Sequence, residues 1–590
     1  MKITSNVVQE KSKNNCEKNF TSIKGFVWSK KKFDESNIET LRNEFNLDIS
    51  IAKLAISRGI TATSYKNFIE PKLKYLMPDP SVMDDMEKAT KRIIEVICKK
   101  KKIGILGDYD VDGSCATSLL CSYLLDLGVS YEYHIPDRIK EGYGPNIKAL
   151  RRLKEKNCDL ILTLDCGTTA INSINKISNE GVDVIVVDHH IEAEKSPNAF
   201  AIVNPKKRSD KSGLHNLCAT GVVFFLLCSL NRVLKKNHFF KSRSYPDLIK
   251  YLDLVALATV CDLVKLDQIN RTFVKQGIKV LNNTKNIGLS CLIEHSSINQ
   301  KINEYHLGFI LGPRINAGGR VGDSKIGTSL MISKEKKISS LLSKKLCDLN
   351  NLRKIVEKKV EKDALDQIEE NDENIICVHK DDWHPGVLGI VASRLTEKFK
   401  KPSIVISEKE MVCTASCRSV KSFDIGQFII NSVNDGKLIS GGGHKMAGGF
   451  TIEKSKIKDF KRYLKDKFLR KPEDISKNYE FELFISSINN KLFHLIDKFS
   501  PFGIGNPKPK FLVKDCSITF PKLVGEKHYS FFLQDSFGNS IKAISFNSKG
   551  TEIGKIIEET STVNGVIVTI TLNKWNGAEN VELFVEDIIN

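Results

Sequence analysis

Three short apolar runs in the first half of the chain predict parallel β-strands. Residues 103–106, 160–164 and 182–187 are rich in Ile, Leu and Val, and segments with helical spacing of apolar residues separate them. Runs that are apolar throughout are typical of strands buried on both faces of a parallel sheet. The pattern predicts an α/β domain in which an acidic residue follows each of the three strands.

Segments of different character surround these strands. Residues 1–24 are polar, and we expect a disordered leader there. Residues 25–335 are predicted to form one α/β domain with a helical N-terminal segment. Residues 336–371 carry apolar positions at helical spacing among many charges, which predicts a long connecting helix. This helix is either a solvent-exposed rod between two lobes or an ordinary packed helix.

The second half of the chain predicts two further domains. Residues 372–470 contain a second α/β pattern that ends in the glycine-rich stretch 440–444. Residues 478–590 alternate between apolar and polar positions with Gly and Asn turns, which is typical of a small β-barrel of the OB type or a sandwich. Phe531, Phe532 and Phe546 are candidates for stacking on bases. Neighbouring residues of a strand face opposite sides, so at least one of Phe531 and Phe532 faces the core.

Composition narrows the class of protein and of its partners. Lys and Arg number 90 against 71 Asp and Glu, a net charge of +19, which favours a polyanion such as nucleic acid or reflects a general lysine bias. The 15 cysteines form no C-x-x-C pair, so we expect reduced thiols in the cytoplasm. The longest apolar run, 222–230, is too short for a bilayer, which needs about 20 residues, and we expect no membrane association.

Acidic and histidine side chains follow the three predicted strands. Because parallel strands end at the same edge of a sheet, these side chains can converge, and neighbouring carboxylates raise one another's pKa unless a cation neutralises them. Oxygen ligands with one or two imidazoles favour Mn²⁺ or Mg²⁺. For any single one of these acids, a helix cap or a turn is the alternative role, and Asp112 is predicted to cap the helix that begins near Ser114. The residues that follow the strands are Asp108 and Asp110, then Asp165, then Asp188, His189 and His190.

Seven ordered motifs resemble those of the DHH phosphoesterase family. In particular, their combination is similar to the bacterial single-strand-specific DNA exonucleases of that family, from about residue 50 to the end. The motifs are Gly107–Gly113, Leu164–Gly167, Asp188–His190, Leu254–Asp262, Gly312–Arg320, Trp383–Arg394 and Ser440–Gly449.

The resemblance implies a metal-dependent catalytic site. It assigns five ligands for two Mn²⁺ or Mg²⁺ ions, and Asp188 and His190 beside them as residues that orient ligands or contact the scissile phosphate. Asp262 enters only through the resemblance; the alternative for it is a buried acid at a helix end. The five implied ligands are Asp108, Asp110, Asp165, His189 and Asp262.

Further residues are predicted to bind the substrate strand. Guanidinium groups can fork onto phosphates, with a structural ion pair as the alternative, and a glycine run can present backbone N–H groups to an anion or form a plain turn. Ala415 and Cys417 stand where the family has glycines, while Arg418 and Ser419 remain as donors. The predicted substrate-binding residues are Arg314, Asn316, Arg320, Arg418, Ser419, Gly442, Gly443 and His444.

The resemblance also implies architecture and activity. It implies a DHH domain over 25–335, a DHH-associated domain over 372–470 and an OB-like domain over 478–590. It implies 5′-to-3′ hydrolysis of single-stranded DNA to mononucleotides in DNA repair and recombination, by a monomer. A single-strand-binding protein and a helicase are candidate partners, and the sequence leaves the repair partners open. The rival hypotheses are a phosphodiesterase for dinucleotides or very short RNA, and a catalytically silent scaffold. The preferred metal, the tolerance of RNA and the roles of His384 and His528 stay open.

Overall fold

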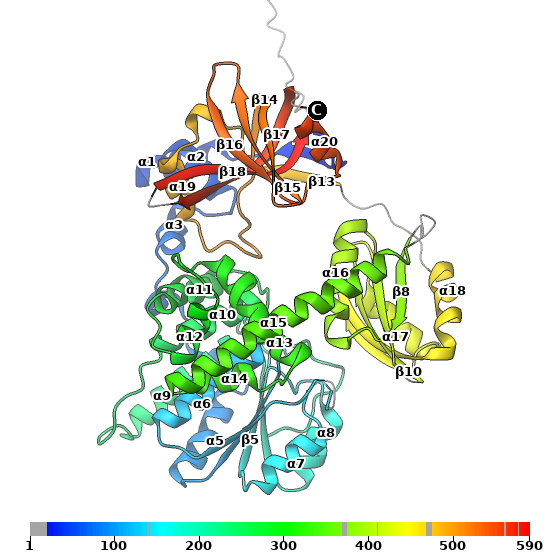
Figure 1. Cartoon of the computed structure of the whole chain (residues 1–590). Coiled ribbons are helices and arrows are strands. Elements are labelled where there is room, and N and C mark those ends of the chain that lie inside the picture. Colours follow the sequence, from blue (N-terminus) through cyan, green and yellow to red (C-terminus); the bar gives the residue numbers. More distant parts are fainter. Residues whose placement is uncertain are drawn as a thin grey trace, which may run out of the picture. The chain divides into compact units, whose positions relative to one another are not determined.

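The chain forms two compact units in a computed structural model (Figure 1). The structure describes residues 20–138, 141–142, 144–368, 374–409, 411–467, 475–559, 562–575 and 578–589. One unit, Pro71–Glu473 with Gly503–Gly505, holds both α/β domains. The other combines the residues up to Glu70 with Asp474–Phe502 and Asn506–Asn590.

The first α/β domain is built on a five-stranded, wholly parallel sheet of order β4-β3-β5-β6-β7. The three predicted strands are confirmed as β3, β5 and β6. The two outer strands escaped prediction because β4 is half exposed and β7 is only three residues long. The strands are β3 Ile103–Gly107, β4 Tyr131–His134, β5 Leu160–Leu164, β6 Asp183–Val187 and β7 Ala201–Val203.

Helices cover both faces of this sheet. Ile105 and Leu162 face a large core shared with α5, α6 and α9, whereas Leu106 and Ile161 face a smaller core beneath α7 and α8. Burial on both faces explains the uninterrupted apolar runs. The helices are α5 Met86–Cys98, α6 Val111–Asp126, α7 Ile147–Glu155, α8 Ile171–Asn179 and α9 Ala219–Lys236.

A further helical layer extends the large core of this domain. It begins with α4 and η1 ahead of the sheet and continues after α9. The elements are α4 Leu73–Leu76, η1 Pro80–Val82, η2 Ile249–Tyr251, α10 Leu252–Cys261, α11 Gln268–Leu281, α12 Ile287–His295, the π-helix η3 His306–Leu311, α13 Gly312–Val321 and α14 Ile326–Ile332.

The predicted connecting helix is α15, Lys336–Leu365, which is 30 residues long. Leu346 is buried in the core of the first domain, and Val360 and Ala364 are buried in the core of the second. The buried Glu357 carboxylate pairs with Arg353 of the same helix and with Arg394 of α16. The helix is therefore packed at both ends rather than a free rod. Residues 369–371 of the predicted segment lie outside the described residues.

The second α/β domain contains a mixed sheet of order β11-β12-β10-β9-β8. Only β8 and β9 pair in parallel; the pairs of β9 with β10, β10 with β12 and β11 with β12 are antiparallel. The glycine-rich stretch 440–444 is the edge strand β11, not a turn. The elements are β8 Ile376–Asp381, η4 Pro385–Val387, α16 Leu388–Phe399, β9 Ser403–Glu408, β10 Val412–Arg418, α17 Ile425–Asn434, β11 Ser440–His444, β12 Ala447–Glu453, η5 Lys454–Lys456 and α18 Ile457–Lys467.

A closed five-stranded barrel of order β14-β15-β16-β18-β17 dominates the other unit and confirms the predicted barrel. Phe531 is buried in its core, so it is not a candidate for base stacking, whereas Phe532 and Phe546 are exposed. The elements are β13 Ser476–Tyr479, η6 Ile485–Ser487, α19 Asn490–Asp497, β14 Phe511–Val524, β15 His528–Asp535, β16 Ser540–Ser545, α20 Glu552–Glu558, β17 Thr562–Trp575 and β18 Ala578–Ile589.

The N-terminal segment differs from the prediction in two respects. Its helices share a core with the barrel. The prediction had placed them in the first α/β domain, over residues 25–335. Within the predicted leader, Phe20–Thr21 form β1, although residues 1–19 lie outside the described part. Trp28 Nε1 and Ser22 Oγ both donate to Asp587 Oδ2, at 2.9 and 2.6 Å, a contact between distant parts of the sequence. The elements are β1 Phe20–Thr21, β2 Val27–Lys30, α1 Glu35–Phe45, α2 Ile49–Ile56 and α3 Ala62–Ile69.

Within the described residues, every helix is too short or too polar to span a bilayer. The cysteines of the same part of the chain are all free thiols.

Candidate metal centre

Three aspartates continue the parallel ladder beyond the ends of β3, β5 and β6. The backbone N–H of Asp108 donates to Leu164 O at 3.2 Å, and that of Asp165 donates to Val187 O at 3.0 Å. Asp188 N donates in the same way to Val203 O of β7 at 3.1 Å. Each aspartate is therefore held at the carboxyl edge of the sheet by the strand beside it, so their side chains meet there as predicted.

The start of α6 is pressed closely against this edge. A Cβ at Gly113 would lie 2.5 Å from Asp108 O, so only glycine permits the approach. Asp110 is the N-cap of α6, and its Oδ1 accepts from Gly113 N at 3.0 Å. Asp165 has a left-handed φ of 61°, which turns the chain sharply after β5. The local backbone thus brings Asp108, Asp110 and Asp165 to one point.

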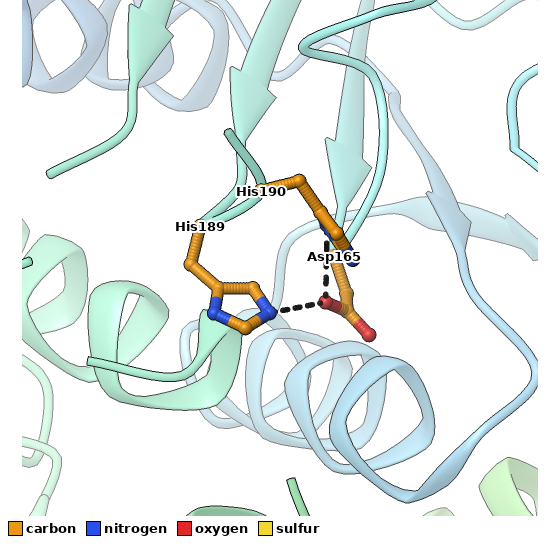
Figure 2. A group of neighbouring side chains, drawn as sticks. All are labelled: Asp165, His189 and His190. Atoms are coloured by element: carbon orange, nitrogen blue, oxygen red, sulfur yellow. Dashed lines mark ion pairs between the residues drawn. The ribbon is translucent and has the colours of Figure 1, made fainter. Parts of the chain in front are cut away.

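His189 lies among carboxylates that come from three elements. Its Nε2 is 3.3 Å from Asp165 Oδ1 (Figure 2). The same atom is 3.6 Å from Asp262 Oδ2 and 3.8 Å from Asp112 Oδ2. Asp262 is the C-cap of α10, so it does lie at a helix end. Its side chain nevertheless reaches this cluster, as a metal ligand would. Three sets have ligand atoms within 4.8 Å of one another: Asp108, Asp110 and Asp165; Asp165, His189 and His190; Asp112, His189 and Asp262.

Several carboxylate oxygens of this cluster lack a hydrogen-bond donor among the described residues. Asp108 Oδ1, Asp165 Oδ1 and Asp262 Oδ2 are buried and accept no hydrogen bond from the described part of the chain. Burial and the neighbouring carboxylates hold the pKa of Asp108 and Asp165 well above the ordinary value and raise that of Asp262 to about 8. Burial lowers the pKa of His189 to about 4, so its ring is neutral at pH 7 and can act as a ligand. Carboxylate oxygens that accept no hydrogen bond, together with a neutral imidazole, are suitable ligands for divalent cations such as Mn²⁺ or Mg²⁺.

Asp188 holds its neighbours in position rather than joining the ligand sets. Its carboxylate accepts from Thr168 N at 3.0 Å, from His189 N at 2.7 Å and pairs with His190 Nδ1 at 2.7 Å. Burial alone would lower the pKa of His190, but the Asp188 carboxylate outweighs it and raises the value to about 9. The same contacts depress the pKa of Asp188 in spite of its burial. His190 therefore carries positive charge at neutral pH.

Asp112 differs from its predicted role. Its carboxylate accepts from Ala219 N at 2.6 Å and Thr220 N at 2.8 Å, so it caps α9 and not its own helix. The same side chain belongs to one of the three ligand sets. Because α9 begins more than a hundred residues later, no local pattern could reveal this contact.

Asn204 is a supporting residue that the sequence reasoning missed. Its Nδ2 donates to Thr168 Oγ1 at 2.9 Å and to His190 O at 2.8 Å. Asn204 directly follows β7. The other site residues were found because each follows a predicted strand, and the same rule would have identified Asn204 if this short strand had been predicted.

Several arginines gather near the cluster. Arg320 Nη1 donates to Gly386 O at 3.0 Å, and burial together with Arg138, Arg353 and Arg418 lowers the pKa of its guanidinium to about 10. The Arg138 guanidinium lies 5.4 Å from the centre of the Tyr109 ring, next to Asp108. Tyr109 and Arg138 were not singled out from the sequence. The positive charge of Arg138 contributes to the lowered pKa of both Arg320 and Arg418.

Other predicted substrate residues lie differently. Arg314 Nη1 donates to Ile310 O at 2.7 Å, and it precedes Arg320 by six positions on α13, which is about 240° around a helix. Arg314 and Arg320 therefore do not fork onto one phosphate, and Asn316 lies between them on the same helix. Both donors of Ser419 are already used, by Phe423 O and Met446 O. Ser419 would have to exchange one of these internal contacts to donate to a phosphate, and its role in substrate binding stays a prediction.

The second domain brings its glycine-rich edge strand and Arg418 into the same unit. A Cβ at Gly442 would meet nothing within 4 Å, whereas one at Gly443 would lie 2.4 Å from Ala447 O. Burial, followed by the positive charges of His190 and Lys206, lowers the pKa of His444. Ala415 and Cys417 are buried in the core beneath β10, so their side chains do not obstruct the open face at Gly442.

His384 and His528 have structural contacts. His384 Nδ1 accepts from Gly386 N at 3.1 Å and so caps η4, while His528 Nδ1 accepts from Asn547 N at 2.8 Å beside Phe546.

Sequence models of three domain families match the chain in order. The DHH family N-terminal domain matches residues 102–259, the DHHA1 domain matches 372–469, and the RecJ OB domain matches 479–587. A single-stranded-DNA-specific exonuclease RecJ of *Bacillus subtilis* is 32% identical over 573 residues, which cover 95% of this chain and 70% of that protein. The protein of the same name from *Escherichia coli* is 28% identical over 91% of this chain and 95% of its own length.

Solved structures have the same fold. RecJ from *Thermus thermophilus* in complex with Mn²⁺ superimposes with a TM-score of 0.80 at 24% identity, over 94% of this chain and 78% of that chain. A second structure, of exonuclease RecJ bound to manganese, has a TM-score of 0.58 at 28% identity, over 68% of this chain and 97% of that one.

Proposed function

Because this chain belongs to the RecJ family of single-stranded-DNA-specific exonucleases, we propose that it degrades single-stranded DNA from the 5′ end to mononucleotides in a metal-dependent reaction. The observation that carries the proposal is the set of buried carboxylate oxygens around His189 that accept no hydrogen bond from the described part of the chain. A DNA-binding scaffold without catalysis would gain nothing from the electrostatic cost of this arrangement.

Two divalent cations, Mn²⁺ or Mg²⁺, are proposed to bind this cluster. Asp108, Asp110, Asp165, His189 and Asp262 would hold them, and Asp112 is an additional candidate because its Oδ2 lies 3.8 Å from His189 Nε2. When bound, such ions lower the pKa of a water molecule and neutralise the charge that develops on the phosphate.

The chain's own residues are proposed to orient the scissile phosphate. Asp188 fixes the ring of His190 through Nδ1, and the resulting positive charge attracts a phosphate oxygen. Asn204 anchors the backbone of His190 from the other side. Arg138, Arg320 and Arg418 are proposed to hold a phosphate at the end of the strand, which would place that end beside the acidic cluster.

The second domain and the barrel are proposed to hold the rest of the strand. Gly442 on the edge strand β11 has open space where a Cβ would stand, which allows a sugar–phosphate backbone to approach, with His444 as a donor beside it. Phe532 and Phe546 on the barrel surface suit base stacking. A barrel of this type is an argument for long strands over dinucleotides as substrates.

The cellular setting completes the proposal. Free thiols throughout the described part of the chain suit the reducing cytoplasm. In DNA repair and recombination, a nuclease restricted to single strands needs DNA that has been unwound. We therefore propose that the monomer works with a helicase and a single-strand-binding protein.

End-labelled substrates test this function directly. We expect a 5′-labelled single strand to release labelled mononucleotide at once in Mn²⁺ or Mg²⁺, and a 3′-labelled strand to release it only at the end of digestion. Duplex DNA and chelator-treated reactions should show no product. Preferential cleavage of dinucleotides or short RNA would instead support the phosphodiesterase hypothesis, and inactivity on every substrate would support the silent scaffold.

A further inference from the structure

Two exposed aromatic rings stack on each other next to the helix that carries Asp262. Tyr305 and Phe309 are 54% and 70% exposed, with ring centres 5.1 Å apart and planes inclined by 24°. Large aromatic side chains on a protein surface that make no contact with its core are costly in water and frequently mark a binding surface.

The backbone beneath these rings is a π-helix, η3, bound tightly to the end of α10. Cys261 Sγ donates to Leu307 O at 3.4 Å, and a Cβ at Gly312 would lie 2.4 Å from that sulfur. A Cβ at Gly308 would be 3.4 Å from the Val260 side chain. The residue after Cys261 is Asp262, so the aromatic pair is fixed to the same structural element as the acidic cluster. Single-turn π-helices frequently occur at functional sites.

Positive charge and further apolar surface lie along the same segment. Arg314, five positions after Phe309, donates through Nη1 to Ile310 O, and its buried Nε has no hydrogen-bond partner among the described residues. Leu263, directly after Asp262, is 68% exposed. An aromatic platform combined with a guanidinium group is the arrangement by which proteins hold the bases and backbone of single-stranded nucleic acid.

We propose that Tyr305 and Phe309 form a platform on which a base of the substrate strand stacks while its phosphate lies in the acidic cluster. The platform is distinct from the metal ligands, from the arginines Arg138, Arg320 and Arg418 and from the barrel, and its ligand is an unpaired nucleobase. Base-paired DNA cannot offer an exposed base face to these rings, so the platform adds to the selection of single strands. This inference rests on the proposed function, because it assigns part of the same substrate path.

The test measures base stacking separately from catalysis. Strands carrying the fluorescent base 2-aminopurine at successive positions are bound to the full chain in chelator, so that they are not degraded. We expect quenching at one position, its loss in Phe309→Ala with about tenfold weaker binding, and its retention in Phe309→Trp. An abasic site at that position should weaken binding by the wild-type chain to the same extent and should have no further effect in Phe309→Ala.

A matched control is Tyr245→Ala. Tyr245 is 52% exposed, and the centre of its ring lies 5.7 Å from Lys235 Nζ near the C-terminal end of α9, the end opposite to the one that Asp112 caps. We expect this variant to bind and quench like the wild type. Unchanged affinity and quenching in both Phe309→Ala and the double variant Tyr305→Ala/Phe309→Ala would overturn the platform. Hydrolysis by the wild-type chain in Mn²⁺ is measured in parallel, and its absence would count against the proposed function independently of the stacking result.

Discussion

The two sheets of the unit Pro71–Glu473 differ in how they expose chemistry. The parallel sheet ends in acidic side chains that are almost completely buried, and Asp108 Oδ1 and Asp165 Oδ1 have no hydrogen-bond partner within the described residues. The mixed sheet ends in a strand of glycines, and the open space beside the backbone at Gly442 is what it offers to a ligand. One sheet gathers buried carboxyl groups, whereas the other provides space and backbone amides.

The two sheets lower the stability of the fold in different ways. Burying carboxylates together opposes folding until a cation neutralises them. A glycine edge strand costs conformational entropy and packing but carries no electrostatic penalty. Changes in the first sheet should therefore affect catalysis and metal-dependent stability, and changes in the second should affect binding of the strand or backbone strain.

The largest effect is expected for Asp165→Ala. This change removes a carboxylate shared by two ligand sets. Hydrolysis of single-stranded DNA should fall by at least about a thousandfold, while equilibrium binding of DNA in chelator changes little. Rates from single-turnover digestion and affinities from fluorescence anisotropy measure the two quantities. Asp366→Ala, at an exposed helix end, is the control; near-normal turnover of Asp165→Ala in Mn²⁺ would refute the assignment.

Divalent metal should stabilise the fold, and more so at higher pH. The pKa of Asp262 is raised to about 8 by burial, Asp112 and Asp110, so the stability it contributes without metal is present at low pH and is lost as pH rises through about 8. The melting temperature in chelator should therefore fall between pH 6 and pH 8.5. Saturating Mn²⁺ should raise the melting temperature, and the greater increase is expected at pH 8.5. At a Mn²⁺ concentration of one hundred times the Kd, the free energy of unfolding should increase by about 2.7 kcal/mol.

Thermal melts with and without Mn²⁺ measure this effect. Asp165→Ala serves as the matched variant and should show a smaller increase with Mn²⁺. An increase of equal size in both proteins would place the bound metal elsewhere.

Asp188→Asn should reduce activity without removing a ligand. The amide preserves the size of the side chain but loses the charge that orients His190 and raises its pKa to about 9. Activity should fall by about 10- to 100-fold, and the alkaline limb of the pH–rate profile should shift to lower pH. If the profile kept its shape while the rate fell, Asp188 would act by a route other than His190.

A pair of glycines tests the mixed sheet. Gly443→Ala would place a Cβ 2.4 Å from Ala447 O and should lower the free energy of unfolding by about 1–3 kcal/mol. Gly442→Ala meets no neighbouring atom, so it should leave stability unchanged and weaken DNA binding a few-fold by filling the space for the strand. Denaturant melts and binding titrations distinguish the two; equal binding by Gly442→Ala and wild type would remove β11 from the proposed strand path.

Local patterns in the sequence were sufficient for the central features. The strands β3, β5 and β6 follow from uninterrupted apolar runs, and the position of Asp108, Asp165 and Asp188 after them follows from parallel topology. The barrel follows from period-two alternation, which also required one of Phe531 and Phe532 to be buried. These features depend on residues close together in the chain, so the sequence alone determined them.

Contacts between distant segments were decided only by the tertiary structure. Asp112 caps a helix that begins at Ala219, the N-terminal helices share a core with the barrel, and Asp587 accepts from Trp28 and Ser22. Arg138 joins Arg320 and Arg418 from three separate segments. No periodic pattern in the sequence indicates these contacts, because each depends on how whole elements pack and not on the spacing of neighbouring residues.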